Sequence, residues 1–320
     1  MLSRVADSLY WMSRYLERAE HTTRLLDVNL NLMLDESSTI SEYRWLRVLH
    51  ALGHPHELEW EGDPFALTRT LTFDYTHKAS IVSCIISARE NSRHVREQIS
   101  TEMWQRLNSL YLLVTRPGIE AEMEGQTTEF LQIVTEAIHQ FQGITDSTMS
   151  HGEGWQFIQV GRFIERATAT AMLLEAYNDD LFVHPERIPE GNEYLEWMGL
   201  LRSATAFEAY CKVYTADLTA DRILEFLLLD EQFPHSLRFA IDSMQHALEA
   251  IQLESGKSRA EPLHRLGGRL QSMLSFSSID DILDQDVVSV LRNIQLQCRS
   301  IHSTIYELYV DYSIQTALAG

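Results

Sequence analysis

The sequence predicts an all-α protein, a helical bundle made of two internally repeated halves. Apolar residues recur at alternating steps of three and four along most of the chain, and this spacing places them on one face of a helix. Apolar and polar residues do not alternate with a period of two over several segments, so no β-sheet is expected. A charged motif that occurs twice, in Ser13–Asp27 and in Gly161–Glu175, divides the chain into halves.

Both copies of this motif read Arg-x-x-Glu-Arg and end in Leu-Leu followed by an acidic residue. The copies are offset by 148 residues (162 − 14), which is close to half of the 320-residue chain. We therefore predict two helical repeat halves, residues 1–149 and 150–320, that form one compact unit around a pseudo-twofold axis. The charged residues of the two copies are Arg14, Glu17, Arg18, Arg162, Glu165 and Arg166.

The composition excludes several classes of partner. The chain has 26 Lys and Arg against 46 Asp and Glu, and its net charge of −20 repels nucleic-acid phosphates and anionic lipid surfaces. We therefore expect neither nucleic acid nor a membrane as a partner. Arg4 and Asp7 interrupt the segment where a signal peptide would need apolar residues, so a cytoplasmic protein is expected. Cys84, Cys211 and Cys298 lie far apart, which indicates packed thiols rather than disulfides or a zinc site.

The first half is expected to begin with one long helix from Leu2 to Met33, about nine turns in length. One of its faces is apolar, and a second face, which includes Tyr10, Glu17 and His21, mixes apolar and charged residues. A helix with two such faces usually lies inside a bundle. The elements expected after it are a short helix capped by Ser41 that ends near Leu49, a loop at Gly53–Pro64, a helix at Pro64–Thr72, a break at Asp74–His77, and helices at Ala79–Ile99, Glu102–Thr115 and Gln126–Ile144.

The second half is expected to repeat this order of elements. Its motif helix opens after His151, and its apolar residues recur with the same offset of 148 residues. The break between Asp230 and Ser236 has the same length as the break between Asp74 and Ser80. The elements expected after the motif helix are a loop at Val183–Gly191 and helices at Glu193–Tyr214, Ala220–Leu229, Ser236–Leu253, Glu261–Met273 and Asp286–Ile314.

The Arg/Glu residues have two interpretations that are not exclusive. In the first, Glu17 and Glu165 are buried acceptors for arginine guanidinium groups, and the network fixes the register of the helices. In the second, the two sets converge on a pocket where arginines hold a carboxylate or phosphate and a glutamate acts as a base. Glu17 and Glu165 are the candidate catalytic residues. The candidate ligand-binding residues are Arg14, Glu17, Arg18, His21, Arg89, Glu90, Arg93, Arg162, Glu165 and Arg166.

Neither a metal site nor a cofactor is predicted. Helical bundles often hold two metal ions between glutamates and Glu-x-x-His motifs. In this chain Glu136 and His139 form a single Glu-x-x-His motif, and the residue equivalent to His21 in the second half is Ala169. The sequence also has no Gly-rich phosphate loop, no Gly-x-Ser-x-Gly elbow and no catalytic-cysteine context.

Several segments of the chain resemble the bacterial alpha-E family, whose name describes a predicted all-helical domain with a recurring Glu-Arg motif. The resemblance spans nearly the whole chain, and its motifs occur in the expected order. Met172 departs from the family pattern, because an arginine equivalent to Arg24 is expected there. The segments that carry the resemblance are Ser13–Thr22, Ser87–Arg93, Arg96–Ser100, Gly161–Ala167 and Leu229–Phe239.

The resemblance implies a role beside other enzymes. Family members are similar to components of gene clusters that also encode ATP-grasp ligases and transglutaminase-like peptidases, so one of these proteins is the expected partner. We therefore expect a helical binding or scaffold subunit of a peptide-ligase or amide-ligase system, with the Glu/Arg network in its core or cleft. The alternative is an enzyme that acts on amide or peptide bonds through Glu17 and Glu165 with the flanking arginines.

Overall fold

The computed structural model describes residues 3–33, 38–53, 58, 60–123, 125–178, 193–215, 217–255 and 261–310. Over these residues the chain forms helices and connecting turns and no strand, which confirms the predicted all-α class. The helices are α1 (Ser3–Leu32), α2 (Ser38–Ala51), α3 (Pro64–Phe73), α4 (Ile81–His94), α5 (Thr101–Val114), α6 (Ile119–Glu122), α7 (Thr127–Thr148), α8 (Glu153–Asn178), α9 (Glu193–Ser203), α10 (Phe207–Tyr214), α11 (Ala220–Leu229), α12 (Leu237–Ser255), α13 (Glu261–Phe276), α14 (Ile279–Leu283) and α15 (Val287–Ile305), which continues as a π-helical turn at Tyr306–Val310.

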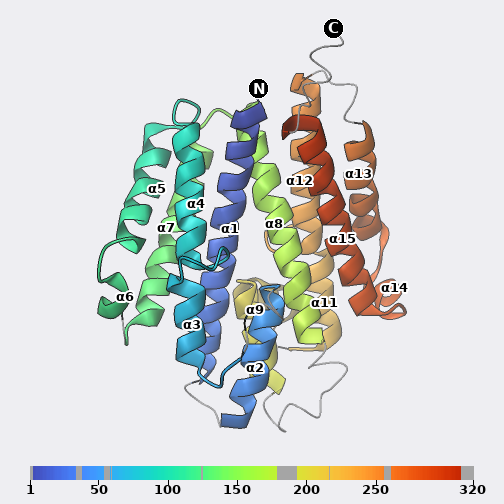
Figure 1. Ribbon diagram of the computed structural model, residues 1–320. Coiled ribbons are helices and arrows are strands. Elements are labelled where there is room, and N and C mark those ends of the chain that lie inside the picture. The colour runs from blue at the N-terminus through green and yellow to red at the C-terminus, as the bar shows by residue number, and fades with distance from the viewer. Residues whose placement is uncertain are drawn as a thin grey trace.

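The two helices that carry the Arg/Glu motifs, α1 and α8, lie side by side in the middle of the bundle (Figure 1). Helices α4, α5 and α7 lie on one side of this pair, and α12, α13 and α15 lie on the other. Helices α2 and α9 lie at one end, where α2 contacts α8 and α9 contacts α1. The motif helices therefore form the centre of the fold.

The central helices run in the same direction and in register. Tyr10 and Ser13 of α1 lie against Gly161 of α8. Further along both helices, Glu17 contacts Arg166, a residue 149 positions later in the chain. This separation nearly equals the 148-residue offset between the motif copies, so the two copies face each other.

Helix α1 is buried on both of the faces that its sequence pattern distinguishes. On the apolar face, Leu9 and Met12 are fully buried, and on the mixed face Tyr10 and Glu17 are 1% and 2% exposed. A buried charge is tolerated only when protein groups replace the water that it loses. The charged residues of the mixed face must therefore find partners on neighbouring helices.

Several helix boundaries differ from the predicted ones. The helix expected at Ala79–Ile99 ends at His94, and the chain then turns through residues 95–98. The helix expected at Glu193–Tyr214 is two helices, α9 and α10, because the backbone turns at Thr205, whose φ of 51° is not helical. The expected loop at 183–191 and residues 311–314 of the last expected helix lie outside the described residues.

The two breaks of equal length make the same hydrogen bonds. Ser80 donates from Oγ to the carbonyl of Asp74 at 2.7 Å and accepts the N–H of Ser83 at 3.2 Å, which caps α4. Before α12, Ser236 donates from Oγ to the carbonyl of Asp230 and accepts the N–H of the residue three positions later at 3.0 Å. The same residue spacing thus starts a helix in the same way at both sites.

Gly161 permits the close approach of α1 and α8, because an added Cβ would overlap the Tyr10 carbonyl and the Ser13 hydroxyl. We expect Gly161→Ala to lower the free energy of unfolding by about 1–3 kcal/mol, measured by chemical denaturation. Gly143→Ala in α7 is the matched control, since nothing lies within 4 Å of a Cβ there. The control should gain up to about 1 kcal/mol from helix propensity. Equal stability of the two variants would contradict the close approach.

Candidate functional site

Each Glu-Arg motif is paired with the other across the interface between α1 and α8. Glu165 accepts hydrogen bonds from Nε of Arg14 and from Nε of Arg18, both at 2.7 Å. Glu17 accepts two hydrogen bonds from Arg166, through Nε at 2.5 Å and through Nη2 at 3.0 Å. Each motif therefore supplies the glutamate that neutralises the arginine of the other motif.

These ion pairs are buried and charged. The side chain of Glu17 is 2% exposed and that of Glu165 is 10% exposed. Burial alone would raise the pKa of Glu165, but Arg14 and Arg18 together lower it to about 2. Burial alone would lower the pKa of Arg166, but the Glu17 carboxylate raises it. Charge-assisted hydrogen bonds of this kind are stronger than neutral ones, and they fix the relative position of the two helices.

Arg14 also connects the network to α15. Its Nη1 lies 3.2 Å from the hydroxyl of Tyr10 and 3.1 Å from Nδ1 of His302. The same hydroxyl and ring nitrogen lie 2.8 Å from each other. The guanidinium carbon of Arg14 lies 4.7 Å from the centre of the Trp11 ring, within cation–π range. The Arg14 side chain is thus held in one orientation.

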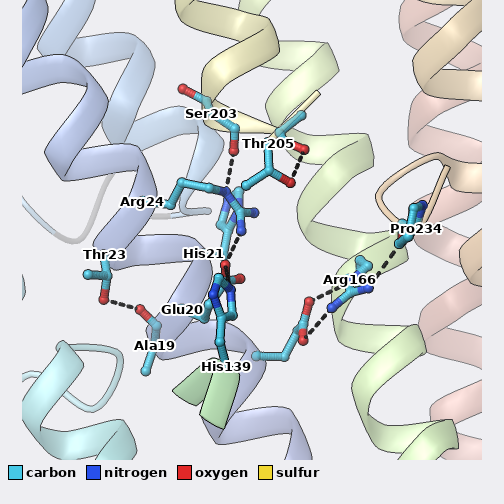
Figure 2. A network of polar contacts seen from close by, with 12 residues as sticks. Ala19, Glu20, His21, Thr23, Arg24, His139, Arg166, Ser203, Thr205 and Pro234 are labelled. Carbon is cyan, nitrogen blue, oxygen red and sulfur yellow. Dashed lines mark hydrogen bonds and ion pairs between the residues drawn. The ribbon is translucent and has the colours of Figure 1, made fainter. Parts of the chain in front are cut away.

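A second chain of polar contacts runs through α1 from α7 to α9, buried at Glu20 and Arg24 and exposed at His139 (Figure 2). Arg24 forms an ion pair with Glu20 one turn earlier and donates from Nε to the carbonyl of Ser203 at 2.6 Å. His139 on α7 lies 3.3 Å from the same glutamate. Burial alone would raise the pKa of Glu20, but Arg24 and its other neighbours hold it well below the ordinary value. These contacts fill the side of α1 that faces α7 and α9.

A third buried set joins α2 to α9 and was not predicted from the sequence. Arg44 and Arg47 each form an ion pair with Glu196, and all three side chains are buried. Arg44 and Arg47 are three residues apart, a spacing that puts both on one face of α2. The spacing could have indicated that the two arginines share a partner, but the sequence does not show which glutamate they contact.

A cavity of about 640 Å³ lies beside the network, between α1, α8, α15 and the C-terminal end of α2. Its lining is mostly apolar, but the charged side chains in it are unevenly balanced. Two glutamates and four arginines line the cavity, so its charged lining is net positive in a chain of net charge −20. The charged lining residues are Arg14, Arg18, Glu165, Glu175, Arg292 and Arg299.

Some of the predicted site residues meet at this cavity and others do not. Arg14, Arg18, His21 and Glu165 line it. Burial, together with the nearby Arg24, lowers the pKa of His21 to about 4, so its ring is neutral at pH 7. The cavity lining does not include the ion pair of Glu17 and Arg166, and it does not include Arg162.

Arg162 occupies a different position from its counterpart Arg14. It donates from Nη2 to Oε1 of Gln142 at 3.0 Å, and its Nε lies 3.9 Å from Glu17. It lines a separate small pocket with Gln142 and Gln159. Burial, together with the neighbouring Arg166, lowers the pKa of Arg162.

Arg89, Glu90 and Arg93 lie on α4 and do not line the cavity. The guanidinium carbon of Arg89 lies 5.2 Å from the ring centre of Trp104 and 4.8 Å from that of Tyr111. Glu90 pairs with Arg89 at 2.5 Å and with Arg93 at 2.9 Å. Since both aromatic residues belong to α5, this cluster joins α4 to α5.

The second glutamate of the cavity holds α15 against α8. Glu175 accepts hydrogen bonds from Nε of Arg292 and from Nε2 of Gln295, both at 2.7 Å. Sequence analysis identified Glu175 as the acidic end of the second motif but did not identify its partners. Arg292, Gln295 and Arg299 are spaced by three and four residues, which places them on one face of α15.

The three cysteines, and the possible metal ligands among the described residues, can be placed in the structure. In that part of the chain no group of three or more His, Cys, Asp and Glu side chains is placed to hold a metal ion, and His54 and His56 lie outside it. Cys84 and Cys298 are buried, and burial raises the pKa of each thiol to about 12, which keeps them protonated. None of the described helices combines the length and the apolarity needed to cross a membrane.

Removing one partner of the central ion pairs should destabilise the fold strongly. Glu17→Gln leaves the buried Arg166 without a counter-charge, and we expect the free energy of unfolding to fall by about 3–5 kcal/mol. Glu261→Gln is the matched control, because its ion pair with Arg265 is exposed and should contribute at most about 1 kcal/mol. Chemical denaturation of both variants measures the difference. A Glu17→Gln protein as stable as the control would contradict a structural role for the pair.

The low pKa of Glu165 predicts a loss of stability in acid. A carboxyl group whose folded pKa is lowered stabilises the fold above its unfolded pKa, and it loses that contribution as pH falls through the folded pKa. For Glu165 the interval runs from the ordinary value of 4.5 down to about 2. We expect this group to account for up to about 3 kcal/mol of the loss. The free energy of unfolding, measured by chemical denaturation at several pH values between 6 and 2, should depend less steeply on pH in Glu165→Gln than in the unmodified protein. An unchanged pH dependence would count against the assignment.

Comparison with known proteins places these features in a family. The chain is 22% identical to the uncharacterized protein Mb2597 of Mycobacterium bovis and to the uncharacterized protein Rv2567 of Mycobacterium tuberculosis, over 338 aligned positions in each case. The alignments cover 99% of this chain and 37% of each relative, so the chain spans little more than a third of their length. No solved structure matches the chain. The Alpha-E family, described as a predicted alpha-helical domain with a conserved ER motif, matches residues 1–310, and the chain belongs to this family.

Proposed function

We propose that this chain is a helical binding subunit that holds an anionic ligand in the cavity between α1, α8 and α15. The observation that carries the proposal is that two arginines of the cavity use only one of their nitrogen atoms to bind the protein. Among the described residues Arg18 and Arg292 each bind a glutamate through Nε alone, which leaves their terminal nitrogens available to a ligand. Guanidinium groups are a common means by which proteins hold carboxylates and phosphates, because their paired N–H donors match the oxygens of these anions.

The geometry favours binding over catalysis by the motif glutamates. A general base works best when its pKa is near the pH of the reaction. The pKa of Glu165 is about 2, and both of its oxygens accept hydrogen bonds from arginines. Both oxygens of Glu17 likewise accept from Arg166. These carboxylates are suited to positioning arginines, which is an architectural role.

The binding subunit is proposed to consist of two repeat halves, residues 1–149 and 150–320, related by a pseudo-twofold axis between α1 and α8. Three features support this organisation. The motif glutamates and arginines pair reciprocally, as in a twofold interface where residue i contacts j and j contacts i. The breaks at Asp74–Ser80 and Asp230–Ser236 share their hydrogen bonds. Helices α2 and α9 each contact the motif helix of the other half.

The proposed partner is an ATP-grasp-type ligase of peptide or amide bonds, or a transglutaminase-like protein, in the cytoplasm. The partner class follows from the gene clusters that the family resemblance implies. In this arrangement the subunit would present a bound acid or peptide product to the enzyme.

Co-purification tests the partner assignment. We expect the tagged full chain, when co-expressed with an ATP-grasp ligase encoded beside it, to co-elute with that ligase in size-exclusion chromatography at micromolar concentrations. An ATP-grasp ligase from an unrelated gene cluster serves as the control and should elute separately. A chain that elutes alone with every neighbouring ligase and transglutaminase-like protein would contradict the assignment.

A further inference from the structure

Arg299 is the cavity arginine that protein groups do not neutralise. It lies on α15, its side chain is exposed, and it makes no hydrogen bond or ion pair with any residue that the structure describes. His302, three residues later on the same helix, contacts Tyr10 and Arg14 of α1. Arg299 therefore lies at the end of the cavity that α1 and the Glu165 ion pairs form.

Arg18 adds free donors at the same end. Its Nε donates to Glu165, and its terminal nitrogens make no hydrogen bond to the described part of the protein. Its side chain is 30% exposed. The lining at this end has one glutamate, Glu165, and three arginines, Arg14, Arg18 and Arg299, so positive charge exceeds negative charge. An anion is favoured at this end, and a planar carboxylate fits the paired nitrogens of a guanidinium group.

The middle of the cavity is apolar. Met172 of α8 lies close to the backbone at Gly53, and Leu71 of α3 is fully buried. Leu296 also lines the cavity, although 55% of its surface is exposed. It lies on α15 between Arg292 and Arg299. An apolar group placed here would remove the surface of Leu296 and Met172 from water, which is favourable.

The other end of the cavity is balanced in charge. Glu175 is bound by Arg292 and by Gln295, so one carboxylate faces one guanidinium group. A second full negative charge on a ligand would gain little at this end. The distribution of charge along the cavity therefore matches a molecule with one anionic end and an apolar body.

We propose that the cavity binds the carboxylate of an apolar organic acid, with Arg18 and Arg299 at the carboxylate and Met172 and Leu296 along the apolar body. The proposal rests on the binding function proposed above and names its ligand class. A free acid and the C-terminal apolar residue of a peptide present the same chemistry to these residues.

Isothermal titration calorimetry of the full chain with three probes tests this assignment. We expect octanoate to bind, and octanamide, which has the same apolar body without the charge, to bind about tenfold more weakly or worse. Inorganic phosphate, which has the charge without the body, should also bind more weakly than octanoate. Equal affinity for octanoate and octanamide, or no heat from octanoate at millimolar concentrations, would overturn the proposal.

Two substitutions on exposed arginines locate the site. Arg299→Gln should reduce the affinity for octanoate about tenfold, because it removes the free guanidinium group. Arg269→Gln on α13 is the matched control, since Arg269 is exposed, does not line the cavity and has no ion pair within the described residues. Neither arginine supports the fold through an ion pair, so both variants should remain folded. Unchanged affinity in Arg299→Gln would overturn the placement of the carboxylate.

Peptide probes distinguish the source of the acid. A tetrapeptide that ends in leucine is titrated with a free C-terminus and with an amidated one. A free-carboxylate peptide that binds more tightly than octanoate assigns the site to a chain terminus, and the reverse order assigns it to a free acid. Co-elution with a ligase does not require acid binding, so an unmodified chain that co-elutes with the ligase but binds neither octanoate nor the free-carboxylate peptide would overturn the ligand assignment alone.

Discussion

The reciprocal ion pairs between α1 and α8 determine how the other helices are arranged. Glu17 pairs with Arg166 and Glu165 pairs with Arg18; both glutamates and Arg166 are buried, and the Arg18 side chain is 30% exposed at the cavity. A slide of one helix by a single residue would leave buried charges without partners, which costs several kcal/mol. The register of the two parallel helices is therefore fixed, and α4, α7, α12 and α15 pack against a pair whose geometry is already set.

Small differences between the two motifs explain why the surroundings of α1 differ from those of α8. Arg24 in the first motif donates to the carbonyl of Ser203 and closes the side of α1 that faces α9. The residue 148 positions later is Met172, an apolar side chain that packs against Gly53 and lines the cavity. His21 is likewise matched by Ala169, and both line the cavity. Where the second motif has shorter or apolar side chains, the structure has a cavity.

The sequence was sufficient to predict the fold class and the central helices, because the apolar period and the motif offset are local properties of the chain. The offset indicated that the two motifs could pair, as Arg14 and Arg18 do with Glu165, but it left open whether these residues line a cavity. The break between α9 and α10 was not predictable, since it contains no proline or glycine and its helix end is bound by Arg24 from α1. The partners of Glu175 on α15 depend in the same way on tertiary contacts, which residue spacing does not encode.

The network that holds the helices together also prepares the proposed binding site. Each guanidinium group has several donors, and Arg18 uses Nε for Glu165 while its terminal nitrogens make no hydrogen bond to the described residues. Glu165 thereby fixes the orientation of donors that a ligand would use, and little side-chain entropy is lost when the ligand binds. A ligand that binds only this folded arrangement must stabilise it. Ligand affinity and the stability of the α1/α8 interface are therefore linked through the same carboxylate.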